Sequence, residues 1–134
     1  MTFTDAELEY LATQRIGRLA TLGPDGFPQN NPVGFRVDPE RGAIEIGGHR
    51  LGASRKWANI VADPKVSFVV DDIESIQPWH VRGIEIRGVA DPLTGVEPMM
   101  AGFSDEMIRI HPYRVRAWGL DPSDPWAATA RTVR

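Results

Sequence analysis

The sequence predicts a mainly β protein, an antiparallel barrel of about six short strands with two small helices. Short apolar or alternating segments recur along the 134 residues, and turn residues such as Gly, Pro and Asp separate them. Helices do not alternate regularly with these strands, as a doubly wound α/β fold would require. The length is that of a single domain.

The first element is a helix that begins after Thr4. Thr4 and Glu7 have the spacing of a capping box, and Phe3 and Leu8 occupy the positions of a hydrophobic staple. These signals define the start of the helix well. We expect the helix to close one end of the barrel.

Three strands are expected next, over Ile16–Leu22, Gln29–Asp38 and Ala43–Gly47. Pro32 lies inside the second segment, which favours an edge strand or a bulge there. In the third segment, alternation predicts that Glu45 faces solvent. The short connections predict that the three strands form a meander.

A second helix is expected over Ser54–Ala62, with its first residue as the N-cap. Trp57, Ile60 and Val61 supply its predicted buried face. Pro64 follows closely, and the residue before a proline avoids helical geometry, so the helix ends there.

Three further strands complete the prediction, over Lys65–Asp71, His80–Ala90 and Met107–Gly119. Pro112 predicts a bend in the last of them. Residues 91–105 are expected to form a loop or a short helix. The domain organisation that follows is a barrel over residues 1–120 and a C-terminal arm over residues 121–134, flexible at least in part.

Composition excludes several classes of function. The chain has no cysteine, which excludes disulfides and thiolate chemistry, and its formal charge of −3 argues against nucleic-acid binding. Its apolar runs are strand-sized, far below the roughly 20 residues that span a bilayer. The N-terminal residues lack the basic-then-apolar order of a secretion signal. We expect a soluble cytoplasmic protein.

The start of the second helix carries the strongest signal for a binding site. His49, Arg50, Arg55 and Lys56 lie in a stretch without Asp or Glu, near the hydroxyl of Ser54. Cations in the first turn of a helix oppose its dipole, so a bound anion would explain them. Free backbone N–H groups there add to a phosphate site. The alternative is that these side chains are simply solvated.

Two other regions are weaker candidates. The amides of Asn30 and Asn31, beside Pro32, offer donors and acceptors that suit the polar edge of a flat heterocycle. Trp79 and Arg82 form an aromatic–basic cluster that suits stacking on a ring or burial in an interface. For both regions an ordinary surface or core role stays open.

Catalytic and metal-binding motifs are missing from the sequence. Ser54 is not in a nucleophile elbow, and the three histidines have no metal-ligand spacing. We therefore expect no catalytic side chain and no metal site. If the protein is an enzyme, a cofactor carries the chemistry and the chain positions it.

Five segments in this order resemble the pyridoxamine 5′-phosphate oxidase-like split-barrel superfamily, and within it the small enzymes that use the deazaflavin coenzyme F420. The segments are Gly17–Leu22, Asp25–Pro28, Pro32–Phe35, Ser54–Ile60 with the following Asp63-Pro64, and Gly83–Gly88. The resemblance covers about Thr2 to Leu120.

The resemblance implies a split β-barrel and a homodimer with two cofactor sites at the subunit interface. It implies that the cofactor phosphate lies against Ser54, Arg55 and Lys56. With His49 and Arg50 the basic patch is wider than a single phosphate needs. The resemblance also implies that the ring lies along one strand, and that Trp79 and Arg82 come from the other subunit. The residues expected along the ring are Asn30, Asn31, Pro32 and Val33.

One departure narrows the expected activity. The chain ends without the C-terminal segment that grips the substrate phosphate in pyridoxamine phosphate oxidases, so we do not expect that reaction. The leading hypothesis is hydride transfer between F420 and a small unsaturated organic substrate. The positive surface favours F420, which carries a lactyl-oligoglutamate tail beyond its phosphate. The alternatives are an FMN-dependent oxidoreductase and a non-catalytic flavin-binding protein.

Overall fold

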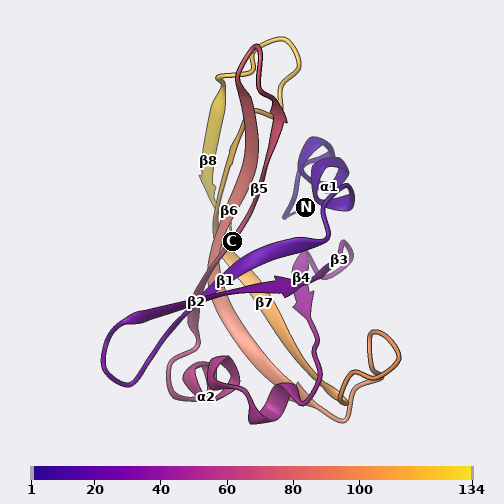
Figure 1. Ribbon diagram of the computed structural model, residues 1–134, viewed down its shortest axis with the longest axis vertical. Helices are drawn as coiled ribbons and strands as arrows, with labels where there is room; N and C mark the ends of the chain where they lie inside the picture. The colour runs from indigo at the N-terminus through magenta and orange to yellow at the C-terminus, as the bar shows by residue number, and fades with distance from the viewer. Residues whose placement is uncertain (1, 134) are drawn as a thin grey trace.

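The computed structural model describes residues 2–133. Figure 1 shows its elements. In chain order they are α1 (Asp5–Ala12), β1 (Ile16–Leu22), β2 (Pro28–Gly34), β3 (Arg36–Asp38), β4 (Ala43–Ile46), the 3-10 turn η1 (Leu51–Ala53), α2 (Arg55–Ala62), β5 (Lys65–Ser75), β6 (His80–Thr94), β7 (Glu106–Trp118) and β8 (Ala128–Thr132).

The strands form one antiparallel sheet in the order β2-β1-β5-β6-β7-β4-β3, with β8 paired to β7. The two end strands, β2 and β3, have no ladder between them within the described residues, so the sheet coils without closing. In Figure 1, β5, β6 and β7 run along the long axis of the molecule while β1 and β2 cross it. The fold is mainly β and split-barrel-like, as predicted.

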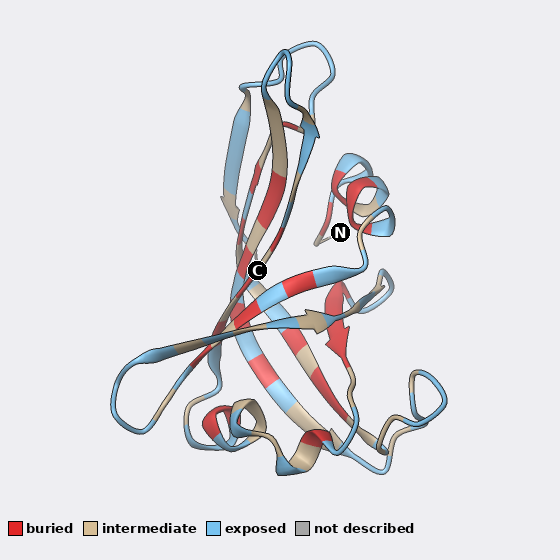
Figure 2. Cartoon of the chain, in the orientation of Figure 1, coloured by how far each residue is buried: buried red, intermediate tan, exposed pale blue. Residues whose placement is uncertain are grey.

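The core is built from the inward faces of these strands, and Figure 2 shows buried segments alternating with exposed ones along them. Both helices add to this core, because α1 contributes Leu11 and α2 contributes Ile60. The largest fully buried side chains are Phe68, Leu11, Leu19, Ile44, Ile46, Ile60, Ile84, Ile86, Ile108, Ile110, Val70 and Val115. The capping box predicted at the start of α1 is confirmed.

The predicted second strand is two strands, because the ladder stops at Gly34 and a new one begins at Arg36. Between them Phe35 packs edge-on against Phe68, with ring centroids 5.3 Å apart. The neighbour pairings of the predicted meander are confirmed, since β1 pairs with β2 and β3 pairs with β4. The break at Phe35 moves β3 and β4 to the other end of the sheet, where β4 also pairs with β7. The expected edge position of Pro32 is confirmed, because β2 ends the sheet.

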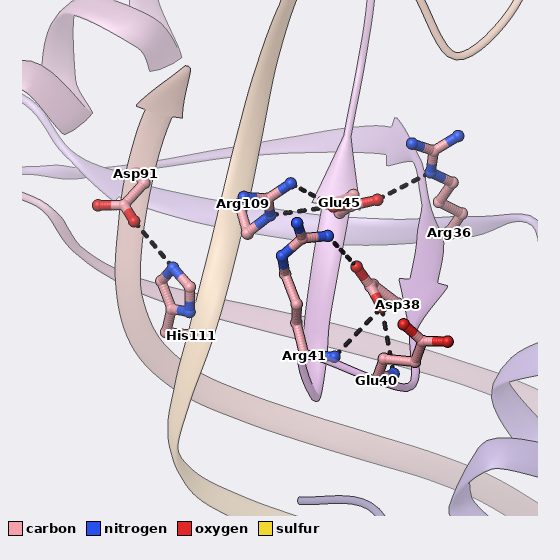
Figure 3. A network of polar contacts seen from close by, with 8 residues as sticks. All are labelled: Arg36, Asp38, Glu40, Arg41, Glu45, Asp91, Arg109 and His111. Carbon is pink, nitrogen blue, oxygen red and sulfur yellow. Dashed lines mark hydrogen bonds and ion pairs between the residues drawn. The ribbon is translucent and has the colours of Figure 1, made fainter. Parts of the chain in front are cut away.

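Glu45 was predicted to face solvent, and that prediction is wrong. All of β4 is buried, because β3 and β7 flank it. The guanidinium of Arg36 donates to Glu45 Oε1 at 2.9 Å, and that of Arg109 donates to Oε2 at 3.0 Å (Figure 3). The carboxylate is buried because two cations pair with it.

Two strands extend beyond their predicted limits. The strand β5 continues to Ser75, and β6 continues to Thr94, so part of the expected loop belongs to the sheet. The bend expected at Pro112 is confirmed as a shift of register, since Arg87 faces Arg114 whereas the next residue, Gly88, faces Pro112.

The segment after Leu120 contains β8, a strand that the sequence did not predict. The side chain of Arg131 on β8 donates to Glu7 Oε2 at 2.8 Å and also bonds Oε1 and the carbonyl of Thr2. Burial would raise the pKa of Glu7, but the hydrogen bonds from Arg131 and from the Thr4 N–H outweigh it and hold this pKa below its ordinary value. The ion pair therefore ties the last strand to the first helix.

Candidate cofactor site

The start of α2 is capped by Ser54. Its Oγ accepts a hydrogen bond from the Trp57 N–H at 3.2 Å, and its hydroxyl donates to the Leu51 carbonyl at 2.6 Å. The hydroxyl of Ser54 therefore both donates and accepts a hydrogen bond within the turn. The first-turn N–H groups of Arg55 and Lys56 have no partner inside the helix and remain for a ligand.

Arg55 and Lys56 form no ion pair with an acidic side chain among the described residues. There is no acidic residue in the first turn of α2. None of the ion pairs found among residues 2–133 involves Arg50, Arg55 or Lys56. These charges sit where the helix dipole is already positive, so an anion bound there would be stabilised by both.

An open groove runs beside these residues, between α2 and the turn that joins β1 to β2. Its volume is about 520 Å³. Arg55, Ala58 and Asn59 line it from the helix, and Gly23 and Gly26 line it from the turn. The groove therefore has a largely apolar wall and carries charges of both signs, because Asp63 lines it together with Arg55.

The predicted ring-binding strand presents alternate residues to opposite sides. In the pairing of β1 with β2, Asn31 faces the buried Leu19, whereas Asn30 faces Ala20. Asn30 and Pro32 are exposed, while Asn31 and Val33 are half-buried on the inner side. A single flat ring lying on one face of β2 would thus meet only one of these two pairs of side chains.

Asn59 connects α2 to this strand, and the sequence did not single it out. Its side chain is 3% exposed, whereas Val61, predicted to be buried, is 63% exposed. Asn59 Nδ2 donates to Gln29 Oε1 at 3.1 Å, and Gln29 Nε2 donates to Asn31 Oδ1 at 2.7 Å. The spacing of Arg55, Asn59 and Ala62 places these three on one helical face, which is the signal that was available.

The loop before α2 separates His49 from the other basic residues. His49 Nδ1 lies 2.7 Å from the Gly102 carbonyl, and its ring meets that of Phe103 edge-on at 5.1 Å. Arg50 is exposed and has a left-handed backbone, with φ of 50°. His49 thus contacts the loop before β7, and Arg50 remains an unpaired cation among the described residues.

Trp79 and Arg82 lie at the far end of the β5–β6 hairpin. Lys65, next to α2, pairs with Val89 at one end of the ladder, whereas Asp72 pairs with Arg82 towards the other (Figure 1). Within one chain these two predicted site residues are therefore remote from α2. Trp79 is 49% exposed.

Arg82 already has partners in its own chain. It forms ion pairs with Asp72 at 2.6 Å and Glu74 at 3.0 Å, and it lies over the ring of Tyr10. The hydrogen bond from Arg82 holds the pKa of Asp72 below its ordinary value. Burial, together with the hydrogen bond to Asp72, raises the pKa of Tyr10. This cluster fastens α1 to the hairpin.

Two negative findings apply to residues 2–133. No group of three or more His, Asp or Glu side chains is arranged to hold a metal ion there. No helix in that range is long and apolar enough to cross a membrane.

The chain belongs to the pyridoxamine 5′-phosphate oxidase family, whose sequence model matches residues 3–123. It is 48% identical over 134 residues to the 5a,11a-dehydrotetracycline/5a,11a-dehydrooxytetracycline reductase of Streptomyces rimosus, a match that covers 99% of this chain and 94% of the reductase. The protein is an oxidoreductase of this family.

Solved structures agree with this assignment. A conserved hypothetical protein of Mycobacterium tuberculosis superposes with a TM-score of 0.68 at 26% identity, covering 87% of this chain and 84% of that one. An F420 reductase superposes with a TM-score of 0.61 at 25% identity, covering 80% of this chain and 94% of that one.

Proposed function

We propose that this protein is an F420-dependent reductase that reduces a carbon–carbon double bond conjugated with a carbonyl in a polycyclic substrate. The observation that carries the cofactor assignment is the start of α2, where Arg55 and Lys56 have no acid partner in the described chain. The substrate class is taken from the 48% identical reductase of a dehydrotetracycline.

The residues present fit the anionic part of this cofactor. A phosphate would accept hydrogen bonds from the first-turn N–H groups of α2 and from Arg55 and Lys56. Arg50 is exposed and precedes Arg55 by five residues. It would add positive charge for the carboxylates of the oligoglutamate tail.

The chain's own part in the reaction is to bind and orient. The reduced deazaflavin supplies the hydride when it is bound. Reduction of a dehydro substrate adds one hydride and one proton across the double bond, and the proton comes from water. We assign no side chain as acid or base, because Arg55 and Lys56 would bind the phosphate and Asn59 does not titrate.

A second candidate is an FMN-dependent oxidoreductase on the same site. The family match to pyridoxamine 5′-phosphate oxidase favours it, since one phosphate needs no more than Arg55, Lys56 and the helix start. The two cofactors differ in charge beyond that phosphate. Their relative affinity is therefore the discriminating quantity.

We further propose that the protein is a cytoplasmic homodimer that builds its cofactor site from both subunits. Exposed apolar side chains support it at the tip of the β5–β6 hairpin, where Ile73 is 54% exposed and Ile76 is 76% exposed. Trp79 and Arg82 on this hairpin would then reach the α2 of the partner. Sedimentation at micromolar concentration should give a mass of twice 14.8 kDa, and a monomer would contradict the dimer.

The direct test is titration of the purified protein with F420 and with FMN, followed by absorbance. We expect tighter binding of F420. The protein is then mixed with reduced F420 and a 5a,11a-dehydrotetracycline. One molecule of F420 should be oxidised for each double bond that is reduced. Tighter binding of FMN, or a yellow protein purified with FMN, would contradict the F420 assignment and favour the FMN-dependent oxidoreductase.

A further inference from the structure

A buried amide fixes α2 against both strands of the β1–β2 hairpin. Asn59 Nδ2 donates to Thr21 Oγ1 on β1 at 3.0 Å and to Gln29 Oε1 on β2 at 3.1 Å. Asn59 is 3% exposed and Thr21 is 2% exposed. An amide nitrogen has two hydrogens, so both donors of Asn59 are used inside the protein.

Gln29 transmits the orientation of this amide to Asn31. Because Gln29 Oε1 accepts from Asn59, its nitrogen points the other way and donates to Asn31 Oδ1 at 2.7 Å. Asn31 therefore turns its oxygen inward and its Nδ2 away from Gln29. Among residues 2–133, no hydrogen bond from that Nδ2 to a protein acceptor is found, and the one side-chain bond of Asn31 is at its oxygen.

We propose that Asn59 is a positioning residue which, through Gln29, makes Asn31 a hydrogen-bond donor towards the bound cofactor. The matching ligand feature is an acceptor, such as a carbonyl oxygen on the pyrimidine edge of a flavin or deazaflavin ring. This inference rests on the proposed function, because it requires the ring to lie along β2. It adds the direction of the hydrogen bond and the buried residue that sets it.

Burial gives the orientation its stability. If Gln29 alone turned over, its nitrogen would face the Asn59 nitrogen and a buried donor would lose its acceptor, which is costly. Only the concerted reversal of all three amides would keep these contacts, with Thr21 then donating to Asn59. That reversed state would present the oxygen of Asn31 to the ligand, and it is the competing arrangement to be tested.

Three substitutions separate the direction of the hydrogen bond from the general stability of the site. In Gln29→Glu, measured at pH 8 where the carboxylate is ionised, residue 29 only accepts, so Asn31 must turn its nitrogen inward. In Asn59→Ala, Gln29 is free to turn. In Thr21→Val, one bond of Asn59 is lost while the contacts from Asn59 to Gln29 and from Gln29 to Asn31 stay, which makes it the matched control.

The expected effects on F420 affinity follow this order. Gln29→Glu should raise Kd about tenfold or more, because the ligand acceptor would lose its donor and face the Asn31 oxygen instead. Asn59→Ala should raise it by roughly threefold to tenfold, because the donor orientation is then only partly populated. Thr21→Val should stay within about twofold while still lowering the melting temperature. Equal affinity of the wild type and Gln29→Glu would overturn the proposal.

A readout without cofactor keeps this test separate from the proposed function. In the ¹⁵N spectrum of the free wild type, both Nδ2 protons of Asn31 should exchange rapidly with water. In Gln29→Glu one of them should become protected and shift downfield. Identical Asn31 signals in the two proteins would overturn the relay. If the wild type bound neither F420 nor FMN, the proposed function and the ligand role of Asn31 would both fall, and these signals would decide the relay alone.

Discussion

Basic residues have opposite surroundings at two places in this molecule. Around β4 and α1, arginines reach acids that are almost fully buried, with Glu45 at 3% and Glu7 at 2% exposure. At the start of α2, Arg55 and Lys56 have no acid partner among residues 2–133. Paired charges of the first kind hold strands and helices together. Unpaired ones beside a groove are available to a ligand.

The comparison predicts that substitutions at the two places separate stability from binding. Acids in the first group should matter for folding and not for cofactor affinity. Cations in the second group should matter for affinity and scarcely for folding. The following predictions run from the largest expected effect to the smallest.

Glu45→Ala should be the most destabilising of these changes. It leaves the guanidinium of Arg109, which is 19% exposed, without its carboxylate, and it also frees Arg36. Breaking a buried pair in this way costs about 3–5 kcal/mol of unfolding free energy. Urea denaturation should measure the loss. Asp38→Ala is the control, because its partner Arg41 is exposed and the loss of stability should be much smaller.

Glu7→Gln should destabilise the protein by about 2–3 kcal/mol near neutral pH, since it weakens the bond to Arg131 on β8. The loss should depend on pH. The pKa of Glu7 is lowered in the folded protein, so its stabilisation is present above the ordinary value of 4.5 and is lost as pH falls through the folded pKa.

The stability of the wild type should therefore fall more steeply than that of Glu7→Gln below about pH 4.5. Unfolding curves at several pH values give the comparison. Parallel curves for the two proteins would show that this ion pair does not hold β8 to α1.

Lys56→Ala should weaken cofactor binding by about 1.5–3 kcal/mol, the range for a hydrogen bond to a charged group. Its unfolding free energy should change little, or rise by about 0.3 kcal/mol, because a cation that opposes the helix dipole is removed. Calorimetric titration and urea denaturation measure the two quantities. Lys65→Ala, a lysine beyond the end of α2 on β5, is the matched control.

Salt should have the smallest effect of this series. Arg50 and the other cations near α2 attract the extra charges of F420, and ions screen exposed charges. Binding of F420 should weaken more with ionic strength than binding of FMN. Arg50→Ala should reduce this difference in salt dependence between the two cofactors. An equal salt dependence in the wild type would show that the wider positive surface does not contribute to F420 binding.

The sequence predicted those parts of the fold that depend on local signals. The capping box of Thr4 and Glu7 and the cap at Ser54 are formed by residues three apart. A short stretch of sequence is therefore enough to predict them. The buried position of Glu45 depends on Arg109, which lies 64 residues away. Strand β8 has few apolar residues, and its link to α1 runs from Arg131 to Glu7, 124 residues apart.

The same limit applies to the candidate site. The positive charge of Arg55 and Lys56 could be read from the absence of acids nearby. The role of Asn59 could not, because it comes from contacts with Thr21 and Gln29 that are 38 and 30 residues away. Which side of β2 faces α2 also depends on its register with β1.

The most direct test of the central claim is one titration series with F420, on the wild type and on the Arg55→Ala/Lys56→Ala double variant. The account predicts submillimolar binding to the wild type and a loss of at least about a hundredfold in the double variant, as two charged hydrogen bonds are removed. The melting temperatures should agree within about 2 °C. Unchanged affinity in a folded double variant would contradict the account, because the unpaired cations at α2 would then have no part in cofactor binding.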